Sequence, residues 1–388
     1  MIKSTIEQDL GKPWTEVFES IEPTAMASAS VAQVHCAVLK GSRKEVVIKV
    51  LKPGVEDILA ALVLKPGVED ILTADMSAVY LMSRFIEFIQ PEIGRLSLTG
   101  IVGDMRSSML DEVDFTKEAA NLAVFSNFLD PRGPRYGATR PFVFSNFLDS
   151  RGLRNVATCP YVYSQFSGKR LLVMEKLNGV SLTDYAAIRS ITAKDPEMVL
   201  VSALNTWFSS VVGCDTFHAD VHAGNLLALS DGRVGFIDFG IVGSISPVTW
   251  KALEALATSL ATADYETMAR ALATIGACDE NVNYAAFSRD LESFFVELEQ
   301  MNKQLVVGAD ASRGVTASVE VDQTQLNRLF LNLVRIGERH GVRFPREFGL
   351  FLKQVLYFDR YTRLLAPSLQ VFTDDRINIR GLSREYGI

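Results

Sequence analysis

HADVHAGN, at His218–Asn225, followed by IDFG at Ile237–Gly240, is the stretch that decides the fold. The first string places Asp220 five residues before Asn225, and the second places Asp238 at the end of a short apolar run. An aspartate on a rigid loop can orient a hydroxyl nucleophile, while an asparagine and a second aspartate supply the oxygen ligands that Mg²⁺ prefers. The two strings together predict Mg²⁺-dependent phosphoryl transfer, with Asp220 as the catalytic group and Asn225 and Asp238 as metal ligands.

Two charged residues earlier in the chain complete this set. Lys49 lies in the β-branched run Glu45–Val50, a predicted strand, where its ammonium would pair with the α- and β-phosphates of ATP. Glu118 lies on a helix predicted over Asp104–Leu129 and is the expected carboxylate partner of Lys49. Asp114, four residues before Glu118, is expected on nearly the same face of that helix.

Two other segments are predicted to hold the nucleotide. The strand predicted over Leu171–Met174 leads into a hinge, with Met174 beside the adenine base and the backbone of Glu175 to Leu177 contacting it. A run of small residues allows the backbone to approach phosphates closely, but alanine avoids the positive φ angles open to glycine, so a stiffer loop is expected than a glycine-rich one. The residues of this run are Ala27, Ser28, Ala29 and Ser30.

Composition and patterning predict an α+β chain. The 388 residues are 48% hydrophobic and 22% charged, which is typical of a folded globular protein. A hairpin is predicted from His35–Leu39 and Glu45–Val50, and helical patterns dominate beyond Gly243. We therefore predict two lobes, a small strand-containing one over residues 1–178 and a large helical one over residues 179–388.

Three helix boundaries are predicted in the second lobe. Ser246-Pro247 combines a capping residue with a proline suited to the first turn. The helix predicted over Gln323–Arg339 ends at His340-Gly341, and Pro345 opens another helix.

Two short segments are each present twice. VLKPGVEDIL at Val50–Leu59 recurs at Val63–Leu72, and VFSNFLD at Val124–Asp130 recurs at Val143–Asp149. A solenoid needs three or more related units, so these pairs do not predict one. We expect the surplus copies to form surface insertions, because the entropic cost of a loop grows slowly with its length.

Charge and cysteine usage exclude some classes of protein. The net charge of −7 is spread without a long basic run, so no nucleic-acid partner is expected. The scattered cysteines form no disulfide framework and are expected as reduced thiols. Cys214, His218 and His222 have the spacing C-x3-H-x3-H, so a zinc site for metal-dependent hydrolysis is an alternative, which a turn predicted at Gly213 disfavours.

Two apolar stretches raise the question of membrane contact. Met198–Cys214 lacks charge, but its serines, threonine and asparagine favour a buried helix over a membrane span. Phe348–Tyr361 is rich in phenylalanine and leucine and is expected in the core, with a membrane- or lipid-facing surface as the alternative. The N-terminal residues name no compartment.

Six segments together resemble the UbiB family of atypical kinases, also called the ADCK or aarF-domain kinases. They are PTAMASASVAQVH (Pro23–His35), VIKVLKPGV (Val47–Val55), DEVDFTKEAAN (Asp111–Asn121), LVMEKLNGVSL (Leu172–Leu182), HADVHAGN and IDFG. The resemblance is strong over about Phe18 to Gly243 and implies a two-lobed protein-kinase-like fold. It also implies ATP and Mg²⁺ as cofactors and a kinase-type or ATPase activity.

The same resemblance implies roles for individual residues and a biological setting. The matching positions are Ala27–Ser30 for the nucleotide loop, Lys49 and Glu118 for the ion pair, Glu112 with Asp114 for the ExD motif, and Asp220, Asn225 and Asp238 for catalysis and metal binding. Members of the family support isoprenoid-quinone biosynthesis, so lipid or quinone-biosynthesis proteins are expected partners, with peripheral membrane association. The implied location is a mitochondrion, a chloroplast or plastoglobule, or the bacterial cytoplasm and inner membrane.

One departure from the family motivates an alternative. The KxGQ motif that lies upstream of the Ala-rich loop in the family is absent from this sequence. Glu112 would then lack its usual partner, and we expect either a fragment or a more open site. The alternative function is a catalytically impaired nucleotide- or lipid-binding scaffold.

Overall fold

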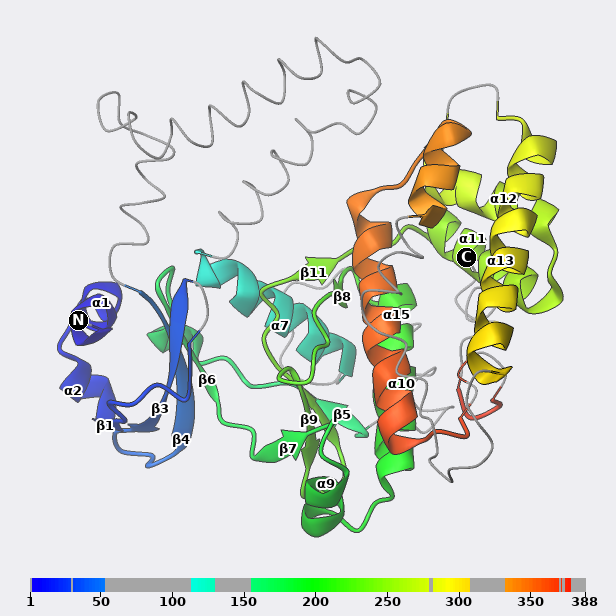
Figure 1. Ribbon diagram of the computed structural model, residues 1–388. Coiled ribbons are helices and arrows are strands. Elements are labelled where there is room, and N and C mark those ends of the chain that lie inside the picture. The colour runs from blue at the N-terminus through cyan, green and yellow to red at the C-terminus, as the bar shows by residue number, and fades with distance from the viewer. Residues whose placement is uncertain are drawn as a thin grey trace, which may run out of the picture. The chain divides into compact units, whose positions relative to one another are not determined.

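The protein forms two compact units, whose elements are labelled in Figure 1. The computed structural model describes residues 2–28, 31–52, 113–129, 155–278, 282–307, 332–369, 371 and 374–377. The first unit consists of residues 1–206 and 214–242, and the second of residues 207–213 and 243–388. The predicted lobe boundary near residue 178 falls inside the first unit and stays a prediction.

An antiparallel sheet occupies the N-terminal part of the first unit. Its strands follow the order β1-β3-β4-β6, and β2 also pairs with β3. Their bounds are β1 Phe18–Ile21, β2 Ala27–Ser28, β3 Ala32–Leu39, β4 Glu45–Leu51 and β6 Leu171–Glu175. The predicted hairpin is confirmed as β3 and β4, with Val34 opposite Lys49. Gly41, at φ +84°, makes the turn between them, because glycine adopts left-handed backbone without strain.

Strand β4 is buried on both faces, and this places Lys49. Side chains alternate along a strand, so Val46, Ile48 and Val50 share one face and Lys49 lies on the other. The three aliphatic residues belong to a core with Ile6 of helix α1 (Ile2–Leu10). Helix α2 (Trp14–Val17) follows α1 and adds Val17 to this core. Lys49 therefore points away from the α1 core, toward the site.

A carboxylate fixes the end of α1 to the sheet. Asp9 Oδ2 accepts hydrogen bonds from the backbone N–H groups of Arg170 at 3.1 Å and Leu171 at 3.0 Å. Arg170 Nε lies 3.6 Å from Asp9 Oδ1. A charged acceptor strengthens such bonds, so Asp9 satisfies the backbone where β6 begins.

Replacing this carboxylate is expected to destabilise the first unit. Asp9→Ala leaves two backbone donors without their acceptor, which costs about 2 kcal/mol. Urea titration measures the loss, and hydrogen exchange at the amides of Arg170 and Leu171 is expected to accelerate. The control is Glu19→Ala, which breaks an exposed 3.8 Å ion pair with Arg43 and is expected to change stability by less than about 0.5 kcal/mol. Equal effects of the two variants would contradict this assignment.

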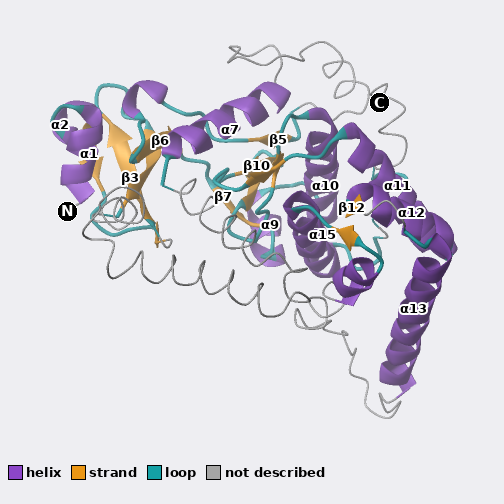
Figure 2. Ribbon diagram, turned by 90° about the horizontal axis from the view of Figure 1, so that it is seen from above, coloured by secondary structure: helices purple, strands orange, loops and turns teal. Residues whose placement is uncertain are grey.

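Helix α7 (Phe115–Leu129) carries Glu118 and contacts both β6 and β5 (Ala157–Thr158), as Figure 2 shows from above. The prediction that the helix includes Asp114 is wrong, because the Asp114 carboxylate instead accepts the backbone N–H of Thr116 at 3.0 Å. Such a side-chain bond replaces the missing helical one at an N-terminus. Asp114 therefore caps the helix and does not share a helix face with Glu118.

Most of the duplicated sequence lies outside the described residues. Val50 and Leu51 of the first pair belong to β4, and residues 124–129 of the second pair lie in α7. Both second copies lie outside the described ranges, as do Glu112 and residues 104–111 of the predicted helix. The prediction of surface insertions therefore stays untested.

A second small sheet frames the motifs that decided the fold. Its order is β5-β10-β9-β7, and β8 pairs with β11 beside it. The bounds are β7 Gly179–Ser181, β8 Phe217–His218, β9 Leu226–Leu229, β10 Val234–Phe236 and β11 Val242–Gly243. The segment that follows residue 178 is thus richer in strands than predicted, because apolar runs of two to four residues form short strands between turns. The 3₁₀ turn η1 is Ser164–Phe166, and the helices of this region are α9 (Tyr185–Ile191) and α10 (Pro196–Gly213).

Within the described residues, the second unit is helical apart from Gly243 of β11 and one short strand pair. Its helices are α11 (Pro247–Thr262), α12 (Tyr265–Ile275), α13 (Tyr284–Val307), residues 332–339 and α15 (Arg346–Leu365), and its strands are β12 (Ala277–Cys278) and β13 (Val342–Arg343). The three predicted boundaries are confirmed, whereas the predicted start of a helix at Gln323 lies outside the described residues. Ser246 Oγ accepts the Thr249 N–H at 3.1 Å, Gly341 has φ +78° after residues 332–339, and Pro345 precedes α15.

The two apolar stretches lie in the core. Residues 199–211 of α10 are nearly all buried, and Trp207 packs on α15, with ring centroids 5.5 Å from Phe351 and 5.3 Å from Phe358. Phe348 and Tyr361 are buried as well. Among the helices that the structure describes, none is long and apolar enough to cross a membrane.

Candidate active site

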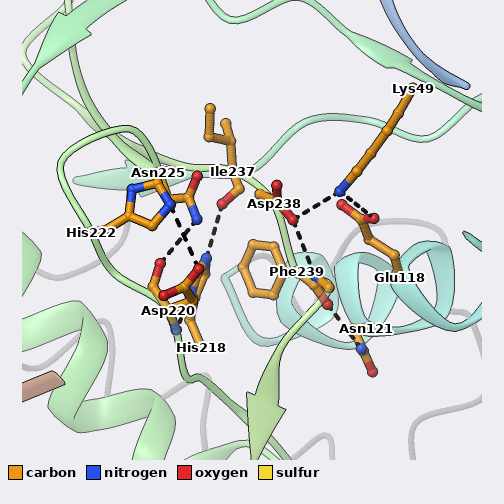
Figure 3. Close-up of polar contacts among 11 residues, drawn as sticks. Lys49, Glu118, Asn121, His218, Asp220, His222, Asn225, Ile237, Asp238 and Phe239 are labelled. Atoms are coloured by element: carbon orange, nitrogen blue, oxygen red, sulfur yellow. Dashed lines mark hydrogen bonds and ion pairs between the residues drawn. The ribbon is translucent and has the colours of Figure 1, made fainter. Parts of the chain in front are cut away.

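A buried lysine joins two carboxylates at the centre of the site (Figure 3). Lys49 Nζ donates to Glu118 Oε2 at 2.9 Å and to Asp238 Oδ1 at 3.0 Å. The side chains of Lys49 and Glu118 are 10% and 3% exposed, whereas that of Asp238 is 44% exposed. The pairing of Lys49 with Glu118 is the one that the sequence predicted. One end of this cluster is therefore closed, and the Asp238 end is open to solvent.

Burial and charge act against each other in this cluster. Burial alone would lower the pKa of Lys49, but the negative charges of Glu118 and Asp238 outweigh it and raise that pKa. Burial raises the pKa of Glu118 to about 7 despite Lys49. Burial would also raise the pKa of Asp238, but Lys49 and the Gly240 N–H outweigh it, and the pKa is lowered. Lys49 and Asp238 thus stay charged at neutral pH.

The backbone of the Asp238 segment is held in an unusual conformation. Asp238 has φ +61°, in the left-handed region, which a non-glycine residue adopts only when its surroundings enforce it. Asn121 Nδ2 donates to the Phe239 carbonyl at 3.0 Å, and the Gly240 N–H donates to Asp238 Oδ1 at 3.3 Å. We did not predict this role of Asn121. Its position three residues after Glu118, on the same face of α7, was the available signal.

An aromatic cluster packs around Phe239, the residue after Asp238. The Phe239 ring lies 4.8 Å from Phe125 of α7 and 4.5 Å from His218, centroid to centroid. Phe236 of β10 lies 5.3 Å from Phe125. These contacts tie α7, the Asp238 segment and the loop after β8 into one packed group.

Hydrogen bonds fix the loop that carries Asp220 and Asn225. His218 Nε2 donates to the Ile237 carbonyl at 2.9 Å, and His218 Nδ1 accepts the Asp220 N–H at 3.1 Å. The Ile237 N–H in turn donates to the Asn225 carbonyl at 3.0 Å. The buried His218 is a structural hydrogen-bonding residue, and its burial lowers its pKa, so the ring is neutral. The loop is thereby locked to the residue directly before Asp238.

The side chains in this arrangement fit a magnesium ion. Asn225 Nδ2 donates to the Asp220 carbonyl at 3.0 Å, which leaves the Asn225 amide oxygen free to act as a ligand. Figure 3 places Asp238 between this loop and the Lys49–Glu118 pair. Carboxylate and amide oxygens are ligands that Mg²⁺ accepts. Glu118 Oε1 is buried without a hydrogen-bond partner among the residues described.

The predicted nucleotide contacts surround this cluster in part. Met174 is buried on β6, and the Glu175 N–H donates to the Tyr161 carbonyl at 2.8 Å, so a contact between this N–H and the base is not available. Leu177 Cδ1 packs against Gly235, 3.0 Å from where a Cβ would lie. The roles of Met174, Glu175 and Leu177 in binding the base stay predictions.

The small-residue loop is described only at its start. Ala27 and Ser28 form the exposed strand β2 beside β3. Ala29 and Ser30 lie outside the described residues. The predicted contacts of this loop with phosphates therefore stay a prediction.

The zinc alternative finds no support in the described part of the chain. Helix α10 ends at Gly213, as the predicted turn required, so Cys214 and His218 do not share a helix. No group of three or more histidine, cysteine, aspartate or glutamate side chains in the described ranges is arranged to hold a metal ion.

The fold agrees with comparisons to known proteins. The ABC1 atypical kinase-like domain matches residues 1–272. The chain belongs to this family. A chloroplastic aarF domain-containing protein kinase of Arabidopsis thaliana, named as uncharacterized, is 47% identical over 100% of this chain and 66% of its own length. A probable protein kinase UbiB of Edwardsiella ictaluri is 25% identical over 96% of this chain and 60% of its own.

The predicted resemblance to the UbiB and aarF-domain kinases is thus confirmed. The chain spans about two thirds of the length of the curated relatives it matches. Among solved structures, the Mycobacterium tuberculosis protein Rv3197, in complex with erythromycin, is similar at a TM-score of 0.50 and 21% identity, covering 94% of this chain and 82% of that one. This likeness supports the kinase-like α+β fold and nothing beyond it.

Removing the lysine is expected to destabilise the protein in a pH-dependent way. Lys49→Met leaves the Glu118 carboxylate buried without its cation, which costs about 3 kcal/mol at pH 8. Because the native pKa of Glu118, about 7, lies above its ordinary 4.5, the native state binds an extra proton between these values. The contribution of Glu118 to the free energy of unfolding therefore falls as pH rises through this window, and the deficit of Lys49→Met should be smaller at pH 6.

Urea titrations at pH 6 and pH 8 measure both effects. The double variant Lys49→Met/Glu118→Gln has no ionisable group at either position, so it is expected to recover stability at pH 8 relative to Lys49→Met and to lose the pH dependence. A deficit of Lys49→Met that is the same at both pH values would show that Glu118 is not the source.

Proposed function

We propose that this chain binds ATP with Mg²⁺ and transfers or hydrolyses the γ-phosphoryl group, as an atypical kinase or ATPase. The observation that carries the proposal is the ammonium of Lys49, which bridges Glu118 on α7 and Asp238, two residues after β10. A buried ammonium held beside a half-exposed carboxylate is a phosphate- and metal-binding arrangement. Membership of the ABC1 family supports it.

Each residue of the site has a part in this proposal. Lys49 binds the α- and β-phosphates, and Glu118 holds its ammonium in position. Asp220 orients the attacking hydroxyl or water and accepts its proton. Asn225 and Asp238 would hold Mg²⁺, which when bound neutralises charge on the phosphates.

Two segments would hold the rest of the nucleotide. Met174, Glu175 and Leu177 would line the binding site of the adenine base. The contact from Glu175 would be made by the backbone carbonyl of Glu175. The backbone of Ala27–Ser30 would lie against the phosphates.

The biological setting follows from the relatives. Resemblance to the UbiB kinases supports a role in isoprenoid-quinone or other prenyl-lipid metabolism, with lipid or quinone-biosynthesis proteins as partners at a membrane surface and no nucleic acid. The relatives include a chloroplastic plant protein and bacterial proteins. A chloroplast or bacterial setting is therefore proposed ahead of a mitochondrial one.

Two substitutions test metal binding and catalysis separately. Asp238→Asn removes a charged metal ligand, so the stabilisation of the protein by ATP is expected to lose its dependence on Mg²⁺ in a thermal-shift titration. Asp220→Asn keeps the metal ligands, so it is expected to bind Mg²⁺ and ATP normally and to lower the rate of phosphate release about 100-fold or more.

The outcomes separate an enzyme from a scaffold. Mg²⁺-dependent ATP binding without phosphate release or transfer by the unaltered chain would support the nucleotide-binding scaffold instead. Failure of the unaltered chain to bind ATP would overturn the proposal altogether.

A further inference from the structure

His222 lies beside the proposed catalytic aspartate, and the mechanism above gives it no part. Its Nε2 atom is 3.6 Å from Asp220 Oδ2, and its side chain is 44% exposed (Figure 3). That distance is longer than a hydrogen bond. The ring and the carboxylate are therefore in ion-pair contact without a hydrogen bond between these two atoms.

The loop sets which nitrogen of this ring carries the proton. The Gly224 N–H donates to His222 Nδ1 at 2.9 Å, so Nδ1 is an acceptor and the neutral ring carries its hydrogen on Nε2. Gly224 also makes room for the ring, because a Cβ at this position would lie 2.9 Å from His222 Cε1. The Nε2–H group of this half-exposed ring thus lies next to the Asp220 carboxylate.

An acceptor and a donor side by side suit the two partners of phosphoryl transfer. The Asp220 carboxylate can only accept a hydrogen bond, so it suits the attacking hydroxyl or water, which brings a proton. The His222 Nε2–H can only donate, so it suits the anionic oxygens of the phosphoryl group under attack. HADVHAGN contains no lysine or arginine, and its His218 and Asn225 side chains donate to backbone carbonyls. His222 is therefore the side chain of this string placed to offer such a donor beside Asp220.

We propose that His222 is a further catalytic residue, whose Nε2–H donates a hydrogen bond to a non-bridging oxygen of the transferring phosphoryl group. The inference rests on the proposed function. No bond to the imidazole forms or breaks, and the proton stays on Nε2 throughout. A fixed donor of this kind stabilises charge that grows in the transition state, and its loss lowers kcat more than it weakens substrate binding.

A purely structural role for the ring is the competing explanation, and two substitutions distinguish them. His222→Asn keeps an acceptor near the position of Nδ1 for the Gly224 N–H and removes the donor at Nε2. His222→Gln places an amide NH₂ near the position of Nε2 and gives up the acceptor at Nδ1. Catalytic donation predicts that the Gln variant is the more active of the two, whereas loop support predicts the opposite.

The experiment measures the steady-state release of phosphate from ATP with Mg²⁺ and the Kd for ATP by thermal-shift titration. His222→Asn is expected to lower kcat about 100-fold with an unchanged Kd, and His222→Gln to retain most of the kcat. Gly224→Ala, which crowds the ring, is expected to lower kcat in the same way. The matched control is His340→Asn, because His340 Nε2 also faces a carboxylate, at 2.9 Å from Asp290 Oδ2, in the second compact unit, and its kcat should be unchanged.

Several outcomes would overturn this inference. If His222→Asn keeps its kcat while His222→Gln loses it, the ring only supports the loop. If His222→Asn changes Kd and kcat by the same factor, its contact is not specific to the transition state. If the unaltered chain binds ATP but neither hydrolyses it nor transfers phosphate, the proposed function fails first, and the role of His222 with it.

Discussion

The ammonium of Lys49, held between Glu118 and Asp238, is the interaction on which the rest of the structure depends. It joins the first sheet, helix α7 and the segment after β10, which are far apart in the sequence. Taking these charges out of water is expensive, and the cost is offset only while all three groups stay together. The surrounding packing, from the α1 core to the ring of Phe239, keeps them in place.

Each end of the loop that carries Asp220 and Asn225 is held by a neighbouring strand. Strand β8 ends at His218, β9 begins directly after Asn225, and β10 ends shortly before Asp238. The bonds of His218 and Asn225 to Ile237 close this arrangement. Chemistry that needs groups in fixed positions is therefore placed on loops only a few residues long between paired strands. The same rigidity explains how Asp238 is kept at a positive φ.

Residue type and spacing singled out Lys49, Glu118 and Asp238, which the structure brings into contact. Asp220 and Asn225 were predicted in the same way, and the roles of all five residues stay predictions. Asn121 and the contact between His222 and Gly224 were missed, because a neutral side chain bonded to backbone leaves little trace in composition or periodicity. The start of α7 was misplaced because the apolar spacing extends to the N-terminal side of Asp114. The helix begins only after Asp114, whose side chain caps it.

Strand β4 has a consequence for how the chain finds its pairing. Its two faces are both covered, one by aliphatic side chains and the other by the charged cluster. A slip of one residue against β3 and β6 would turn the ammonium into the aliphatic layer and aim a valine or an isoleucine at the carboxylates. The penalty for such a slip includes an unpaired buried charge. Lys49, which is proposed to bind the phosphates, thereby also helps to fix the register of β4 in the sheet.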